Sequence, residues 1–208
     1  MMNVCYQCGQ YRPDKIIDPQ GPYAICPECG CRHPFLRLPL FIVSGASAAG
    51  KSTLLQYLLG RVTEYVLLDS DILWRPAFNQ PDNQYRDFFE TWLRVCKNIA
   101  QSGRPAMLFG AGLGVPKNIE ACVERRYFSQ VHYLALVCED EVLSARLLNR
   151  PQWRISHSAE FIEAQQAFNR WFKQSGLEQA PPITLVDTSS TSVEAAAEQV
   201  IAWSRART

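Results

Sequence analysis

The stretch FIVSGASAAGKSTLL, residues 41–55, sets an apolar run directly against a row of small residues that ends in a lysine. An ordinary turn needs one or two glycines, whereas this one runs GASAAG before the lysine. The letters fit the pattern G-x-x-x-x-G-K-[ST], with Gly45, Gly50, Lys51 and Ser52 at its specified positions. The apolar run before the pattern indicates a buried strand, and the residues after it indicate a helix.

This strand–turn–helix stretch has the chemistry of a phosphate-binding loop. Small residues let the backbone curl so that successive N–H groups point at phosphate oxygens, and a helix N-terminus adds partial positive charge. Lys51 is then expected to reach the β- and γ-phosphates, while the hydroxyl of Ser52 ligates Mg²⁺. The alternative is a glycine-rich turn that arose without a ligand. The residues expected to contact ATP are Gly45, Ala46, Ser47, Ala48, Ala49, Gly50, Lys51, Ser52 and Thr53.

Strand and helix patterns alternate from residue 38 to the end of the chain. Most of the expected strands are unbroken apolar runs, which is typical of a parallel sheet covered by helices on both faces. The fold class is therefore α/β, with one main domain over residues 38–208 and a short, cysteine-rich head over residues 1–36. Strands are expected at residues 40–44, 65–71, 105–112, 131–137 and 183–189, and helices at 51–60, 85–103, 117–128, 140–150, 158–173 and 192–205.

Positive and negative charges nearly balance. The 208 residues include 21 Lys and Arg against 20 Asp and Glu, so the formal net charge of +1 gives no general attraction to nucleic acid or anionic membranes. No apolar run approaches the ~20 residues of a membrane span, and the N-terminal stretch lacks the apolar segment of a signal peptide. We therefore expect a soluble, cytoplasmic protein.

Two aspartates follow the second expected strand. In LLDSDILW, Asp69 and Asp71 stand two residues apart and point the same way on an extended chain. Ligands of open parallel sheets bind beyond the carboxyl ends of the strands, so one carboxylate can hold Mg²⁺ while the other orients or deprotonates an acceptor hydroxyl. The alternative is that both are turn residues or helix caps. Because the third strand ends without an aspartate, the metal role falls to Asp69.

Glycines follow the third expected strand, and arginines follow the fourth. Gly110, Gly112 and Gly114 permit close approach of the backbone to a substrate, or else form a tight loop. The arginines recur every four residues across a helix end broken by Pro151. Guanidinium groups fit phosphate oxygens and can close over a nucleotide on a mobile lid, whereas the alternative is a solvated basic helix face. The three arginines are Arg146, Arg150 and Arg154.

GASAAGKST, LDSD, the glycine-rich turn and the arginine segment together resemble the small P-loop kinases, which phosphorylate nucleosides, nucleotides, shikimate, gluconate and similar metabolites. The resemblance covers residues 38–208, and LLDSDILW is also similar to bacterial proteins described as ATP-binding or nucleoside-kinase-like. It implies a P-loop NTPase-type sheet that binds ATP with Mg²⁺. It further implies that Asp69 supports magnesium, that Asp71 contacts the acceptor and that Arg150 assists transfer from the lid. The glycine-rich turn would line the acceptor site.

The head has the cysteine spacing of a zinc site. CYQCGQ and CPECGC give two C-x2-C pairs separated by seventeen residues, and this head resembles a zinc ribbon. Four thiolates in two knuckles suit a closed, tetrahedral and structural Zn²⁺ site, whereas the alternative is a redox pair or disulfides. Cys31 and His33 are surplus candidates that could replace the last ligand. The four predicted ligands are Cys5, Cys8, Cys26 and Cys29.

Metal binding is expected to supply the folding energy of the head, because so short a segment has too little core to fold unaided. Metal removal is then expected to unfold the head while the ATP site survives, since the phosphate loop begins only after a separate strand. The head carries few basic residues, which argues against nucleic acid and leaves a protein as its expected partner.

These features favour an ATP-dependent phosphotransferase that moves the γ-phosphate to a small-molecule acceptor, with nucleosides and nucleotides among the candidates. The aromatic-rich stretch from Trp74 to Trp92 would wall the acceptor site, with Arg75 and Arg86 as phosphate or carboxylate contacts. Two alternatives remain open. One is a nucleotide-dependent switch or NTPase whose zinc head docks a partner, and the other is a protein that handles nucleic acid.

Overall fold

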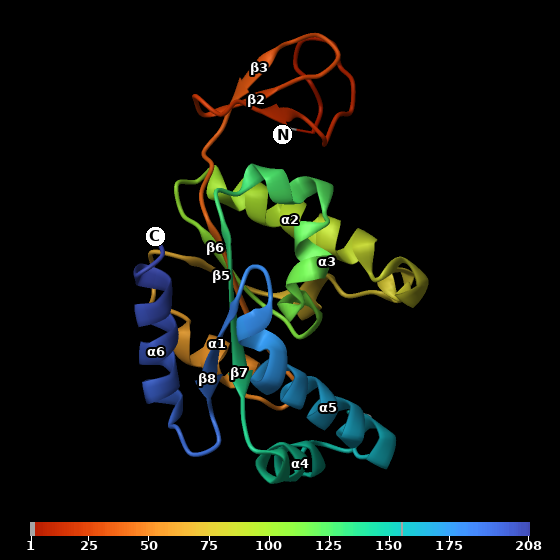
Figure 1. Cartoon of the computed structure of the whole chain (residues 1–208), viewed down its shortest axis with the longest axis vertical. Helices are drawn as coiled ribbons and strands as arrows, with labels where there is room; N and C mark the ends of the chain where they lie inside the picture. The colour runs from red at the N-terminus through yellow and green to blue at the C-terminus, as the bar shows by residue number, and fades with distance from the viewer. Residues whose placement is uncertain (1–2, 155) are drawn as a thin grey trace.

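The chain forms a small antiparallel sheet near its N-terminus and a larger parallel sheet after it (Figure 1). This computed structural model describes residues 3–154 and 156–208. The larger sheet has the order β5-β6-β4-β7-β8, and every pairing within it is parallel, which confirms the expected α/β class. Its strands are β4 (Leu40–Gly45), β5 (Val66–Asp69), β6 (Ala106–Phe109), β7 (Val131–Val137) and β8 (Ile183–Asp187).

Helices cover both faces of the larger sheet. They are α1 (Lys51–Leu58), α2 (Arg86–Ala100), α3 (Pro116–Glu120), α4 (Asp140–Leu148), α5 (Ala159–Ser175) and α6 (Val193–Arg205). Figure 1 shows α1 and α6 on one face and α2, α3 and α5 on the other. Leu40 and Ile42 of β4 enter the core beneath α2 and α5, whereas Phe41 and Val43 enter the core beneath α1 and α6. No helix of the described residues has both the length and the apolar character needed to cross a bilayer.

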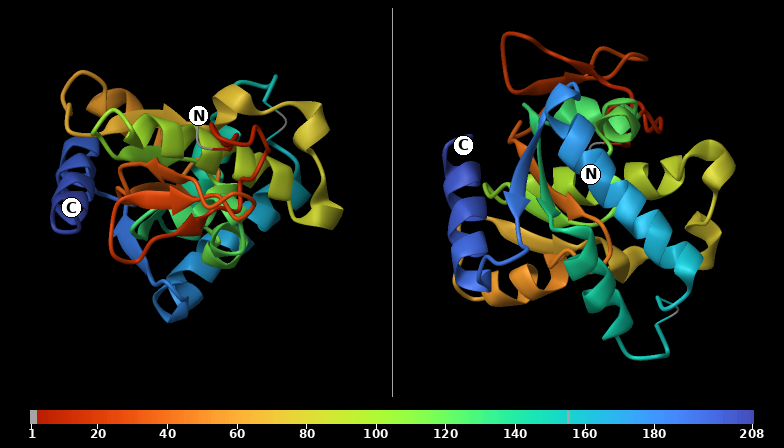
Figure 2. Two further views of the ribbon diagram at one scale, coloured as in Figure 1. Left: turned by 90° about the horizontal axis from the view of Figure 1, so that it is seen from above. Right: turned by 60° about the horizontal axis from the view of Figure 1, so that its bottom comes forward.

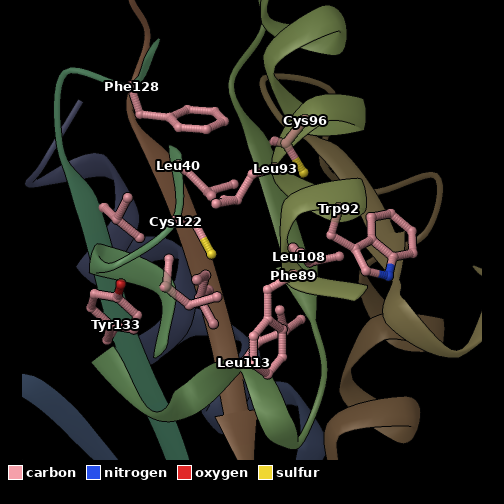
Figure 3. Packing of buried hydrophobic residues seen from close by; sticks show 14 of the residues in the cluster. Leu40, Phe89, Trp92, Leu93, Cys96, Leu108, Leu113, Cys122, Phe128 and Tyr133 are labelled. Atoms are coloured by element: carbon pink, nitrogen blue, oxygen red, sulfur yellow. The ribbon is translucent and has the colours of Figure 1, made fainter. Parts of the chain in front are cut away.

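Helix α2 also fixes the segment that follows β5. Figure 3 shows the core on this face, in which Leu93 of α2 points toward Leu40 of β4. Trp92 is fully buried, and its indole N–H donates to the carbonyl oxygen of Ser70 at 3.1 Å. Ser70 lies directly after β5, so this contact anchors the stretch that carries the two predicted acidic residues.

The helix predicted over residues 117–128 is wrong in its middle. The structure has the short α3 and then a separate 3₁₀ turn, η5 (Val123–Tyr127). The carboxylate of Glu90 on α2 accepts the N–H groups of Val123 and Glu124 at 2.6 and 3.0 Å, so these amides are not bonded back into a helix. A side chain distant in sequence therefore ends α3. The other predicted helices and the five predicted strands are present, with ends that differ by a few residues.

The head is a three-stranded antiparallel sheet at the end of the molecule where the strands of the larger sheet begin (Figure 2). Its strands are β1 (Ile16–Ile17), β2 (Tyr23–Ile25) and β3 (Arg32–Pro34). The backbone N–H of Leu36 donates to Gln101, just after α2, at 2.9 Å. The predicted phosphate loop follows the opposite end of β4, so the head lies away from it.

A buried polar network joins the head to the main domain. The amide of Asn3 donates to the carboxylate of Glu124 at 2.7 Å, and the ammonium of Lys97 bonds both of these side chains. The side chains of Lys97 and Glu124 are 0% and 1% exposed. Burial lowers the pKa of Lys97, and the attraction of Glu124 opposes that shift. The hydroxyl of Tyr127 adds a bond to the carbonyl oxygen of Pro13 at 2.8 Å. The head thus covers a buried ion pair of the main domain.

Candidate functional site

The loop between β4 and α1 has the backbone of a phosphate-binding turn. Gly45 has a φ of +138°, and a Cβ built there would lie 2.4 Å from the carbonyl oxygen of Leu136, so a larger residue would clash. Gly50, with a φ of +110°, directly precedes the first residue of α1. Ala48 also has a positive φ of 69°. The backbone itself therefore favours glycine at positions 45 and 50.

Lys51 begins α1 and turns back over this loop. Its ammonium donates to the carbonyl oxygens of Gly45 and Ala46 at 2.8 and 2.9 Å. Burial lowers the pKa of Lys51 to about 8, although the negative charge of Asp71 opposes that shift. The positive charge is held in a desolvated position, where an anionic phosphate would favour its charged form.

Two adjoining clefts meet at this lysine. One has a volume of about 430 Å³ and extends toward the loop after β8, and the other has about 150 Å³ and lies beside the ends of β5 and β6. Both are lined by Lys51, Ser52 and Arg150. The larger cleft adds residues that include Thr53, Arg146, Thr188 and Thr191, and the smaller adds residues that include Ser47, Asp69, Asp71, Gly110 and Arg154.

The two aspartates lie together in the smaller cleft. The Oδ1 atom of Asp69 accepts the backbone N–H of Asp71 at 3.0 Å, so Asp69 caps the 3₁₀ turn η1 (Ser70–Leu73). This is the capping role considered as the alternative, and it is compatible with a metal role because a carboxylate has two oxygens. Asp71 is exposed and stabilises the charge of Lys51 more than Asp69 does. Oxygen donors of this kind, with Ser52 beside them, fit Mg²⁺.

The glycines after β6 are required first by packing within the protein. A Cβ at Gly110 would lie 2.2 Å from the hydroxyl oxygen of Ser70, and one at Gly114 would lie 2.1 Å from that of Ser44. The tight-loop alternative therefore accounts for these two positions, and Gly110 lines the smaller cleft as well. At Gly112 the nearest atoms would be 3.9 Å away. Substrate contact at Gly110 and Gly112 stays a prediction.

The three arginines spread from the larger cleft to the smaller one. Arg146 lines the larger cleft and donates to the side chain and carbonyl oxygens of Thr188 at 3.2 and 2.6 Å. Arg150 lines both clefts, and burial, followed by the charge of Arg154, lowers its pKa. Arg154 lines the smaller cleft and lies 5.1 Å from the ring of Trp153, which is 75% exposed.

The aromatic stretch after η1 contributes to both core and surface. Trp74 is 47% exposed, and its ring packs edge-on against Phe88 with centroids 5.2 Å apart. The guanidinium of Arg75 lies 4.8 Å from the ring of Phe78, and Arg86 donates to a backbone carbonyl after α3. Neither arginine is among the described residues that line the two clefts. Their contact with an acceptor stays a prediction.

Two parts of the site were missed at the level of sequence. The loop after β8 brings Thr188 and Thr191 to the larger cleft. The sequence could have predicted this, because residues that follow the carboxyl ends of parallel strands line the ligand site. The side-chain oxygen of Gln165 on α5 accepts the backbone N–H of Ser47 at 2.8 Å. No sequence signal separates Gln165 from its neighbour Gln166, which bonds to α4 instead.

The predicted zinc ligands come together in the head. The sulfur atoms of Cys5, Cys8, Cys26 and Cys29 lie within 4.8 Å of one another, with Cys5–Cys29 at 3.5 Å and Cys8–Cys26 at 3.9 Å. Thiolates at about 2.3 Å from a tetrahedral zinc stand roughly 3.8 Å apart, so this donor set fits the ion. Backbone hydrogen bonding at Cys8 lowers the pKa of Cys5 to about 5, whereas burial and the neighbouring thiols raise the pKa of Cys29.

A family model described as an AAA domain matches residues 40–175. The chain belongs to this family. The AAA domain runs from β4 to the end of α5, so it contains the phosphate loop, both aspartates and the three arginines of the clefts. It does not include the head or the loop after β8. Among curated protein sequences, none matches this chain.

The AAA domain of this chain has the fold of small P-loop kinases. A sugar kinase from Janibacter sp. HTCC2649 gives a TM-score of 0.59 at 18% identity, covering 81% of this chain and 95% of that chain. Shikimate kinase from Acinetobacter baumannii gives 0.52 at 18%, covering 83% and 96%. The tunicamycin resistance protein of Deinococcus radiodurans gives 0.59 at 15%, covering 81% and 96%. At these identities the likeness shows the fold and leaves the substrate unidentified.

Proposed function

We propose that this chain is an ATP-dependent phosphotransferase that moves the γ-phosphate to a small-molecule acceptor, with nucleosides and nucleotides among the candidates. One observation carries the proposal. A single cleft is lined by the phosphate-loop residues Lys51 and Ser52, by the paired Asp69 and Asp71, and by Arg150 and Arg154. The second carboxylate beside the loop and the metal ligand suits deprotonation of an acceptor hydroxyl.

The proposed roles follow from the chemistry of each side chain. Lys51 stabilises the charge that develops on the γ-phosphate, and Arg150 and Arg154 approach the same charge from the lid side. Asp71 accepts the proton of the acceptor hydroxyl, since it lies exposed in the cleft next to Lys51. Ser52 and Asp69 would hold Mg²⁺, which supplies charge neutralisation and alignment of the phosphates when it is bound.

The larger cleft is the proposed position of the nucleoside part of ATP. It adjoins the phosphate loop, has about 430 Å³ and contains the threonines of the loop after β8. Arg146 supports this wall through its two bonds to Thr188. The smaller cleft, which Gly110 lines, is then the proposed acceptor site. Gly112 and Arg75 are not among the described residues that line either cleft, and they remain proposed acceptor contacts. The solved sugar kinase and shikimate kinase support the choice of a small molecule as acceptor.

We further propose that residues 1–36 form a structural zinc unit docked on a kinase domain over residues 38–208. The fit of the four thiolates to zinc and the position of the head, away from the phosphate loop, support this division. A protein partner would then meet the exposed surface of the head.

The direct test of the function is ADP release measured with ATP, Mg²⁺ and a panel of acceptors. The panel should contain nucleosides, nucleotides, sugars and sugar acids. We expect one acceptor class to raise the rate well above the rate with water alone. If no small molecule raises it while a protein or nucleic acid does, the switch alternative is correct instead.

Asp71→Asn is expected to lower transfer by roughly 10²-fold or more with little change in ATP binding. The substitution keeps the shape of the side chain but removes the proposed general base. Initial rates at saturating ATP and acceptor measure the effect. Asp69→Asn is the matched comparison, because loss of this proposed ligand should instead raise the Mg²⁺ concentration that transfer requires. The assignment is reversed if Asp69→Asn abolishes transfer at every Mg²⁺ concentration and Asp71→Asn is silent.

Gln165→Ala is expected to lower kcat by on the order of 10-fold, because the phosphate loop loses the hydrogen bond that positions the backbone N–H of Ser47. Gln166→Ala is the matched control, since this neighbour contacts only α4 among the bonds described for it. Both variants should unfold at similar temperatures. Equal kcat values for the two variants would remove Gln165 from the site.

A further inference from the structure

The head contains a second group of metal-binding side chains beside the four predicted thiolates. The ligand atoms of Cys5, Cys31 and His33 all lie within 4.8 Å of one another. Cys5 therefore belongs to both groups. A thiolate that is common to two ligand sets lets one metal ion change its partners without leaving the head.

His33 has an environment that a metal would complete. The side chain is 1% exposed, and neither ring nitrogen has a hydrogen-bond partner within the described residues. Its β3 position is paired with Ala24 of β2, and the ring of Tyr6 covers it with centroids 4.9 Å apart. A buried imidazole normally satisfies its nitrogens with a hydrogen bond or a metal. The ring nitrogen nearest the thiolates is thus available as a ligand.

Cys29 is the ligand of the first group that can leave most easily. Cys5 and Cys26 are buried and Cys8 is partly buried, whereas Cys29 is exposed. Cys29 also lies in the turn between β2 and β3, where Gly30 takes a φ of +73°. His33 is held within β3 by strand pairing, and Cys29 lies outside both strands. Release of the metal by Cys29 therefore requires movement of the turn between β2 and β3 and leaves the sheet in place.

We propose that the head holds one metal ion in two alternative shells that share Cys5. The first is the closed set of four thiolates. The second is built on Cys5, Cys31 and His33, and it holds the metal when Cys29 is disengaged. Three protein ligands leave a fourth position exchangeable, which is the arrangement of reactive rather than purely structural zinc sites. The proposal rests on the zinc site of the head and is independent of phosphotransfer.

The test uses the full chain loaded with Zn²⁺ or Co²⁺, with metal content read by native mass spectrometry. Cys29→Ser should keep one metal per chain, and its Co²⁺ spectrum should show weaker thiolate charge transfer because the second shell has two thiolates and one imidazole in place of four thiolates. Cys5→Ser should lose the metal, since both shells need it. Cys29→Ser combined with His33→Ala should lose it too. The matched control combines Cys29→Ser with His157→Ala, which should still retain the metal because His157 is remote, bonded to the carbonyl oxygens at the end of α4.

A second measurement avoids the risk that a variant fails to fold. The wild-type chain loaded with zinc is treated with limiting N-ethylmaleimide, which alkylates accessible thiols. We expect a species that carries one adduct, at Cys29, together with one metal. The proposal is overturned if every alkylated species is free of metal. It is also overturned if Cys29→Ser carries as little metal per chain as Cys5→Ser, or if adding His33→Ala to Cys29→Ser leaves the metal content unchanged.

Discussion

Substitution of Lys51 by alanine is expected to lower the rate of phosphoryl transfer by roughly 10³-fold or more. The γ-phosphate would lose the main cation that stabilises its developing charge. In the structure the ammonium is held desolvated over the phosphate loop by the carbonyl oxygens of Gly45 and Ala46. Alanine therefore removes the charge from the place where the phosphates would lie. Turnover with the best acceptor, together with ATP affinity, measures the loss.

The Lys51→Ala chain should still fold. It loses two hydrogen bonds, each contributing about 0.5–1.5 kcal/mol, but it also relieves the burial of a charge. Lys117→Ala is the matched control, because this lysine of α3 is exposed and is not among the described residues of either cleft. The site assignment fails if Lys51→Ala binds ATP and turns over as the unchanged protein does.

Glu124→Gln is expected to destabilise the protein by about 3–5 kcal/mol. The neutral amide leaves Lys97 buried without its countercharge, and a broken buried ion pair costs about this much. Arg94, which bonds the same carboxylate at 3.0 Å, and the amide of Asn3 also lose their charged acceptor. Urea unfolding, followed by tryptophan fluorescence, measures the change. The head should detach first, because Asn3 ties it to this network.

Glu64→Gln is the matched control for that loss. Glu64 pairs with Arg205 across an exposed surface, where the side chains are 37% and 65% accessible, so its neutralisation should cost less than about 1 kcal/mol. Equal destabilisation by the two variants would mean that the buried pair does not hold the head in place. ATP binding should survive in both variants, since the network joins the head to the main domain, and the head lies at the end of the sheet opposite the phosphate loop.

Local signals in the sequence were sufficient for most of the fold and for the phosphate loop. The loop from Gly45 to Ser52 is predictable because its small residues, its lysine and its flanking elements are all consecutive. The apolar strands are predictable because burial on both faces leaves no polar alternation. Asp69 and Asp71 could be placed at the site because the ends of parallel strands share one edge.

Contacts between distant residues account for what the sequence did not reveal. Glu90 ends α3 by bonding amides more than thirty residues away, so helix periodicity continues past the true break. Gln165 bonds to Ser47 of the phosphate loop across 118 positions of sequence, and it belongs to no recognisable motif. Asn3 and Glu124 meet across 121 positions, and the burial of charge between them has no local signature.

The most direct measurement of the proposed function is the fate of the γ-phosphate in a single turnover. The chain is mixed in excess over ATP labelled at the γ-phosphorus, with Mg²⁺ and the acceptor class that stimulates ADP release most. The account predicts that the label appears covalently on the acceptor and that Lys51→Ala forms no labelled product on the same timescale. Label found only in inorganic phosphate, at the same rate with and without every acceptor, would contradict it.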